Sequence, residues 1–330
     1  MTKCNVLLSV LVVALIAAAA PAEPFRPQRV PSDAKWVMHI DLQAIVNSNA
    51  GQLVIEEARQ RGLDEKIEAV KSLYGVNPLV DFRSITLFGT GYQPQDAVAV
   101  AQMGSNLGKL EDVVRLSKDY QLLGYRGHVI HSWIEAKGPG AGQRKYCGVW
   151  PDDMLDQTLL VIADTDKQVT TTIDLLEGRR HDLSASDSAV LAKRPATGSF
   201  LFVASDELDP SVMKDPRSAM LQAARNMTMD LGESDGNIFA HATMEAITAE
   251  KAMQIHQMMQ GMMAMAQMAP PAQDGSLPPG AQLAQAVKVN RNESTVTADF
   301  QYPADQFLDL LKRIKAQEQA RRAATPSSAQ

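Results

Sequence analysis

The sequence predicts an α+β protein made of a duplicated unit, with antiparallel sheets that carry their helices packed on one face. Short runs that alternate apolar and polar residues are interleaved with stretches whose apolar residues recur at helical spacing. Both halves of the chain also follow one order of elements: strand, helix, hairpin, helix, hairpin, helix. We therefore expect α+β repeats at 35–178 and 198–315, separated by a polar linker at 179–197.

The first repeat is expected to open with the strand Trp36–Asp41, whose alternation separates Met38 and Ile40 from His39 and Asp41. A helix capped by Asp64 and ended by Gly75 follows. The remaining elements are two helices, near 107–114 and 169–176, and strands at 84–89, 97–103, 128–133, 146–150 and 158–163.

The second repeat is expected to begin with a strand at 199–205 and a helical stretch near Met220. The segment Glu233–Asn237 has the Asp and Gly content of a hairpin turn. The other expected elements are that hairpin's strands at 227–231 and 238–244, a helix at 249–268, a hairpin at 287–290 and 295–302, and a final helix opened by Pro303.

The N-terminus has the features of a cleaved secretory signal at 1–22. Lys3 precedes an apolar run that is shorter than the roughly 20 residues that span a bilayer, and Ala20 and Ala22 supply the small residues that signal peptidase requires. Cleavage after Ala22 predicts a secreted or periplasmic protein with no stable membrane insertion afterwards. A Pro-rich segment at 23–34 then leads into the first repeat.

Composition narrows the possible partners. Loss of residues 1–22 removes Lys3 and changes the formal net charge from −6 to −7, which argues against a nucleic-acid partner. It also removes Cys4 and leaves Cys147 alone, so an internal disulfide is excluded. The Pro- and Gly-rich stretch 270–280 is expected to be a mobile loop, and 316–330 a disordered tail.

The chain lacks the usual catalytic motifs, including the nucleophile elbow, the phosphate loop and the His-Glu-x-x-His zinc motif. His39 and Asp41 share a strand face, where they form either a functional pair or part of a solvated polar face. His128 and His131 are three apart, which sends them to opposite faces of a strand. A dispersed hydrolase site would use His39, Asp41 and His131. The sequence assigns no catalytic residue and no cofactor.

The helix at 249–268 is rich in methionine. Thioethers are ligands for Cu(I), and the weak metal candidates are His256, Met258, Met259, Met262 and Met263. Methionine also fills helix interfaces, and Ile255, which cannot bind a metal, shares a stripe with three of these methionines.

We therefore expect Ile255, Met259, Met262 and Met263 to face inward. We expect Met258, Met265 and Met268 to be more exposed. Packing is the preferred interpretation of this helix, and a copper site is the alternative.

The segments Val30–Asp41 and His128–Trp133, with Gly51 between them, resemble uncharacterised exported proteins that recur in planctomycete-like bacteria. The resemblance implies export and a similar fold, and it transfers no catalytic residue. The sequence thus favours an exported, non-enzymatic envelope protein that binds another protein or an envelope component. A periplasmic copper-binding protein and an unrecognised hydrolase are the alternatives.

Overall fold

The computed structural model describes residues 24–104, 107, 109–137, 140–152, 156–188, 190–191, 193–208, 219–268 and 277–324. The predicted signal 1–22, with its cleavage point after Ala22, lies outside these residues, as does most of the predicted loop 270–280.

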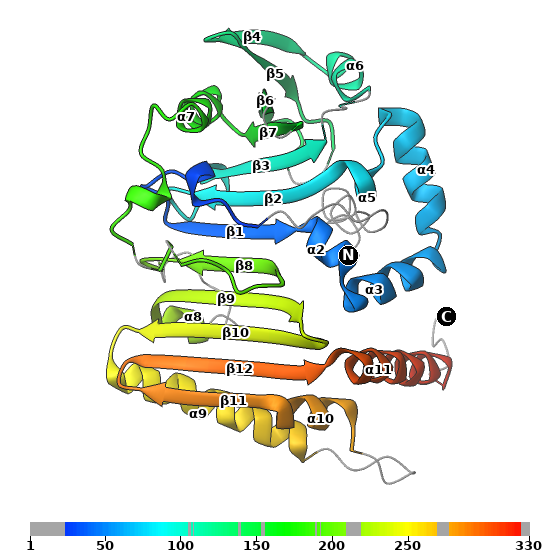
Figure 1. Ribbon diagram of the computed structural model, residues 1–330, viewed down its shortest axis with the longest axis vertical. Helices are drawn as coiled ribbons and strands as arrows, with labels where there is room; N and C mark the ends of the chain where they lie inside the picture. Colours follow the sequence, from blue (N-terminus) through cyan, green and yellow to red (C-terminus); the bar gives the residue numbers. More distant parts are fainter. Residues whose placement is uncertain are drawn as a thin grey trace, which may run out of the picture.

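One antiparallel sheet runs through the whole molecule in the order β11-β12-β10-β9-β8-β1-β2-β3-β7-β6-β5-β4 (Figure 1). This confirms the α+β class. The strands are β1 (Trp36–Asp41), β2 (Phe82–Gly89), β3 (Ala97–Gly104), β4 (Gln121–Tyr125), β5 (His128–Ile134), β6 (Arg144–Asp152), β7 (Gln157–Ala163), β8 (Ser199–Ser205), β9 (Ala224–Ser234), β10 (Asn237–Ala246), β11 (Val287–Asn292) and β12 (Thr295–Pro303).

The two halves thread the sheet in the same way. In the first half the strands lie in the order β1-β2-β3-β7-β6, and in the second half β8-β9-β10-β12-β11. In each half the first strand lies at the centre of the sheet, and the second and third strands follow outward in order. A later hairpin then comes back toward the centre, so that β7 pairs with β3 in the first half and β12 pairs with β10 in the second. Among the described strands, the hairpin β4–β5 extends the first half and has no equivalent in the second. The shared order supports duplication of the unit.

The halves differ from the expectation in one respect, because they share a single sheet instead of forming two. Their first strands, β1 and β8, pair antiparallel along their length, with Trp36 opposite Ser205 and Ile40 opposite Leu201. Pairing them satisfies the backbone edge that each half would otherwise expose.

The described α-helices cover one face of the sheet, with the exception of α7. We call the face that carries Met38 and Ile40 the helix face, and the face that carries Val37 and His39 the core face. The helices of the helix face are α2 (Leu42–Asn47), α3 (Asn49–Arg59), α4 (Leu63–Tyr74), α5 (Pro78–Asp81), α6 (Leu110–Arg115), α8 (Ala219–Gln222), α9 (Ala249–Gln267), α10 (Pro279–Ala286) and α11 (Ala304–Ala324).

Helix α7 (Asp166–Leu176) packs on the core face instead. An added Cβ on Gly148 would lie 2.7 Å from Val169 Cγ1, so the helix comes close to the sheet where β6 has no side chain. Val169 and Ile173 are fully buried in the main core cluster with Val100 and Val161. The leucine, valine and isoleucine residues of α7 recur at helical spacing, so they lie on the side of the helix that packs against the sheet.

The segment 24–34 and the linker 179–197 cover the core face near the middle of the sheet. The rings of Phe25 and Phe202 are 5.3 Å apart. Leu183 and Leu191 of the linker are 0% and 1% exposed. The linker is therefore part of the core of the first half, because its few apolar residues fill a part of the core face that α7 leaves uncovered.

Several element boundaries differ from the sequence-based expectation, among them one end each of α4 and α11. The helix expected to be capped by Asp64 begins two residues earlier, at Leu63, and its N-cap is Gly62 in a left-handed conformation, while Gly75 ends it as expected. At the C-terminus, α11 continues to Ala324, so residues 316–324 of the predicted disordered tail are helical. This part of the tail is rich in Ala, Gln, Glu and Arg, which are strong helix formers.

Candidate apolar binding site

His39 and Asp41 are buried and have structural contacts. His39 Nδ1 lies 2.9 Å from Thr86 Oγ1, and its ring lies against Phe25. Asp41 Oδ1 accepts a hydrogen bond of 2.8 Å from the amide of Ala44, which caps α2. The two side chains are 4% and 2% exposed, so they do not form a solvated polar face.

His131 lies far from that pair. It is on β5, which is separated from β1 by β2, β3, β7 and β6, or about 24 Å at the usual spacing of neighbouring strands. His131 is also on the helix face, opposite Cys147, whereas His39 is on the core face. The three residues of the hydrolase hypothesis therefore do not meet.

His128 points to the core face and bonds Glu177, which confirms that His128 and His131 lie on opposite faces.

Helix α9 divides the metal candidates between two sides. Met259 is partly buried and packs against the cluster that contains Ile255, which is 1% exposed. Met262 is 44% exposed, so its predicted inward position is wrong. It lies four residues from Met258, which is 42% exposed, on the flank that faces solvent.

The remaining methionines of α9 behave as expected. Met263 is partly buried, whereas Met265 and Met268 are 68% and 81% exposed. His256 Nε2 lies 3.3 Å from Gln260 Nε2. His256, Met259 and Met263 therefore share one stripe, and Met258 and Met262 share another, so the five candidates do not converge on one point.

An apolar cavity of about 210 Å³ lies between α6 and the helix face of the first half. One wall comes from α6 and the residue just before it, and the other from alternate residues of the strands. The lining residues are Leu107, Leu110, Glu111 and Val114 on the helix side, and Phe82, Ala101, His131, Trp133, Cys147, Val149, Leu160 and Ile162 on the sheet side.

Strand register brings the sheet-side residues together. His131 pairs with Cys147, and Cys147 pairs with Ile162, so the three side chains form a row across β5, β6 and β7. Leu110 and Val114 are four residues apart and face the sheet from one side of α6. The hairpin β4–β5, which has no counterpart among the strands described for the second half, supplies His131 and Trp133. The cavity therefore belongs to the first half alone.

His131 is the polar group of interest in this cavity. Its Nδ1 atom lies 2.9 Å from the hydroxyl oxygen of Tyr120, whereas its buried Nε2 atom has no hydrogen-bond partner. Burial is the main cause that lowers the pKa of His131 from 6.5; the charge of Arg115 also lowers it, and that of Glu111 opposes the shift. The ring is therefore neutral at pH 7, with one unused hydrogen-bonding position.

Cys147 shows how poorly this site solvates charge. Burial raises the pKa of its thiol to about 12, and the charge of Glu111 adds to the shift. The thiol is therefore protonated at neutral pH, and Cys147 is neither a thiolate nucleophile nor a thiolate metal ligand there.

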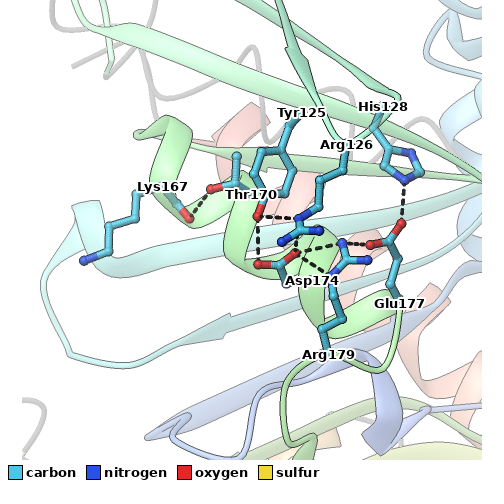
Figure 2. Close-up of polar contacts among 8 residues, drawn as sticks. All are labelled: Tyr125, Arg126, His128, Lys167, Thr170, Asp174, Glu177 and Arg179. Carbon is cyan, nitrogen blue, oxygen red and sulfur yellow. Dashed lines mark hydrogen bonds and ion pairs between the residues drawn. The ribbon is translucent and has the colours of Figure 1, made fainter.

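A polar cluster fastens the hairpin β4–β5 to α7 on the opposite face of the sheet (Figure 2). The Tyr125 hydroxyl donates a hydrogen bond of 2.9 Å to Asp174 Oδ2. Arg179 Nε donates one of 2.9 Å to Asp174 Oδ1, and Arg126 Nε lies 3.6 Å from the same oxygen. Burial acts to raise the pKa of Asp174, but the hydrogen bonds from Tyr125 and Arg179 and the nearby charges of Arg179 and Arg126 lower it overall.

Glu177 completes this cluster. It bonds Nε2 of His128 at 2.9 Å and pairs with Arg179 (Figure 2). The His128 ring in turn stacks on Trp150, with ring centroids 4.6 Å apart. These side chains pair with one another, so we assign the cluster a structural role: it holds in place the hairpin that carries His131 and Trp133.

Within the described ranges, no three His, Cys, Asp or Glu side chains gather so as to hold a metal ion. None of the described helices is both long and apolar enough to span a bilayer. From the sequence alone, His131 is a candidate only for a hydrolase site. The alternation of His131 and Trp133 on one strand was a usable signal, but the pairing of β5 with β6 and β7 was not visible in it.

No protein-family model matches the chain, and no curated protein matches it. Among solved structures it is similar to crystal form III of TP0453, with 6% identity, a TM-score of 0.44, and coverage of 89% of this chain and 99% of that chain. For crystal form I of TP0453 the identity is 7%, the TM-score is 0.39, and the coverage is 89% and 98%. These similarities carry no argument about function, which rests here on the cavity itself.

Proposed function

We propose that the protein is an exported, non-enzymatic binding protein that holds a small, neutral, largely apolar molecule in the cavity under α6. The observation that carries this proposal is an apolar cavity whose wall includes His131, a buried side chain with one unpartnered nitrogen. Small-molecule sites typically have walls that are mostly apolar and contain only a few polar groups. The signal-like segment 1–22 supports an envelope component as the source of the ligand.

The volume of the cavity limits the size of the ligand. A dry apolar cavity of about 150 Å³ can hold one benzene molecule. The cavity under α6 measures about 210 Å³ and therefore has room for a ring or a short chain somewhat larger than benzene. Leucine, valine and isoleucine side chains on both walls would bury such a molecule by the hydrophobic effect.

The surroundings favour a neutral ligand over an anion. The same burial that keeps the thiol of Cys147 protonated also penalises a charged group on the ligand. Glu111, which lines the cavity, would repel a carboxylate. Nε2 of His131 is buried below the apolar wall, so a hydroxyl or carbonyl group on the ligand would have to displace wall atoms to hydrogen-bond to it.

Binding of 1-octanol and of octanoate to the chain without residues 1–22 tests the proposal, with calorimetry as the readout. We expect saturable binding of 1-octanol at one site and much weaker binding of octanoate. Val114→Trp fills the cavity from α6 and should abolish binding. Leu116→Trp is the matched control, because Leu116 lies just beyond the same helix and is 86% exposed.

Two results would overturn the proposal. One is the absence of 1-octanol binding to a folded wild-type chain. The other is binding that Val114→Trp and Leu116→Trp leave equally intact, since the alcohol would then occupy another site.

A further inference from the structure

The two edges of the sheet differ in chemistry. At one end, β11 carries the cations Lys288 and Arg291, which discourage pairing with another strand. At the other end, β4 has the uncharged sequence Gln-Leu-Leu-Gly-Tyr. Leu122 is 52% exposed and Leu123 is 36% exposed. Strand β4 is therefore the edge that is open to another strand.

The turn between β4 and β5 shows which backbone groups of β4 point outward. Arg126 and Gly127 have φ angles of 50° and 87°, as in a two-residue turn that closes a hairpin. In such a hairpin, the flanking residues Tyr125 and His128 exchange both hydrogen bonds, and the pattern then alternates along the strand. The amide and carbonyl groups of Leu122 and Gly124 therefore face away from β5.

We propose that a second copy of this chain pairs with β4 in antiparallel fashion, with the twofold axis passing through Leu123. This register places Leu122 opposite Gly124 of the partner subunit, so that the outward backbone groups of each residue meet those of the other. Leu123 then lies opposite Leu123 of the partner subunit, at a position where side chains of the two strands are close. The two sheets become one continuous sheet.

Charges that flank β4 favour this direction of pairing. The exposed residues Asp119 and Arg126 lie at opposite ends of the strand, and the Arg126 side chain stays 56% exposed beside its contact with Asp174. An antiparallel pair brings Asp119 next to Arg126 of the partner subunit, so opposite charges meet at both ends. A parallel pair would align each charge with its own kind. The uncharged strand between them lets two identical edges approach without repulsion.

Sedimentation equilibrium of the chain without residues 1–22 tests this inference, which does not depend on the proposed ligand. We expect twice the mass of one chain at micromolar concentration. Leu123→Lys places two cations directly opposite each other across the axis. Gly124→Pro removes an amide that faces away from β5, so the hydrogen bonds within the hairpin remain.

Each of these variants should weaken dimerisation at least about tenfold, while thermal melts show that the fold is kept. Asn290→Lys on β11 is the matched control for a charge on the opposite edge and should leave the dimer intact. A monomeric wild type, a dimer that both β4 variants leave unchanged, or a dimer that Asn290→Lys dissociates would overturn the inference.

Discussion

The imidazole of His131 lies with Nδ1 2.9 Å from the Tyr120 hydroxyl oxygen, and its buried Nε2 atom has no partner. The two ring nitrogens thus have different roles. The Tyr120 contact fixes the ring, whereas Nε2 has no hydrogen-bond partner among the described residues. This asymmetry leads to a pH-dependence that can be measured without knowing the ligand.

We predict that His131 makes the fold less stable in acid. Burial lowers its pKa in the folded state, so the unfolded chain, where the pKa is near 6.5, binds the proton more tightly. Stability therefore falls as the pH drops below about 6.5 and is unaffected by this group at higher pH. Urea unfolding of wild type and His131→Gln from about pH 8 to about pH 5 measures the effect. A difference between the two chains that stays constant over this range would contradict it.

We predict that Tyr125→Phe loosens the hairpin β4–β5, because it removes the hydrogen bond to Asp174. The cost should be about 1 kcal/mol in urea unfolding at neutral pH. The pKa of Asp174 is lowered in the folded state, so this contribution is present above its ordinary value of 3.8 and is lost as the pH falls further. Lys167→Ala on the same helix is the control. An equal cost for both changes would argue against the role of the cluster.

We predict that Gly148→Ala destabilises the fold by about 1–3 kcal/mol, because its Cβ would lie 2.7 Å from Val169 Cγ1 and push α7 away from the sheet. Gly104→Ala, with nothing within 4 Å of the added atom, is the control. Adding Val169→Ala to Gly148→Ala should recover part of the loss, and thermal melts of the wild type, each single variant and the double variant give the coupling. Additive effects would mean that α7 does not pack there.

We predict that α9 owes its position to packing and not to copper. Ile255→Ala should cost about 2–5 kcal/mol, because the side chain is fully buried. Met262→Ala and Met265→Ala should each change stability by no more than about 0.5 kcal/mol, because both side chains are exposed. Cu(I) should leave the melting temperature unchanged. A clear copper-dependent rise that Met→Leu changes abolish would favour the metal hypothesis.

Much of the fold follows from local patterns in the sequence. Alternation along the strand Trp36–Asp41 and the turn at 233–237 predict elements that the structure contains. The strand β4 escaped prediction, because two adjacent leucines and a glycine in a strand of five residues give no alternation. The exposure of Met262 could not be predicted either. The spacing of apolar residues defines a stripe along the helix, but it does not fix which flank of that stripe meets the sheet.

The site was harder to predict than the fold. Cys147 and His131 are adjacent only because β5 and β6 pair in one particular register, and nothing in either strand specifies that register. The burial of His39 and Asp41 has a similar cause. Phe25 of the N-terminal segment covers the His39 ring, so a pair that reads as polar surface lies inside the core. Contacts between residues far apart in the sequence therefore determine which side chains come together at the site.

The most direct test of the ligand proposal uses Cys147, which lines the cavity and is the single cysteine once residues 1–22 are removed. Its thiol, with a pKa of about 12, should react slowly with a neutral maleimide in the folded chain. We predict that 1-octanol slows this reaction in a saturable way, with a midpoint equal to the calorimetric Kd. Alkylation of the folded wild-type chain at a rate independent of 1-octanol, at concentrations that saturate the calorimetric signal, would contradict the account.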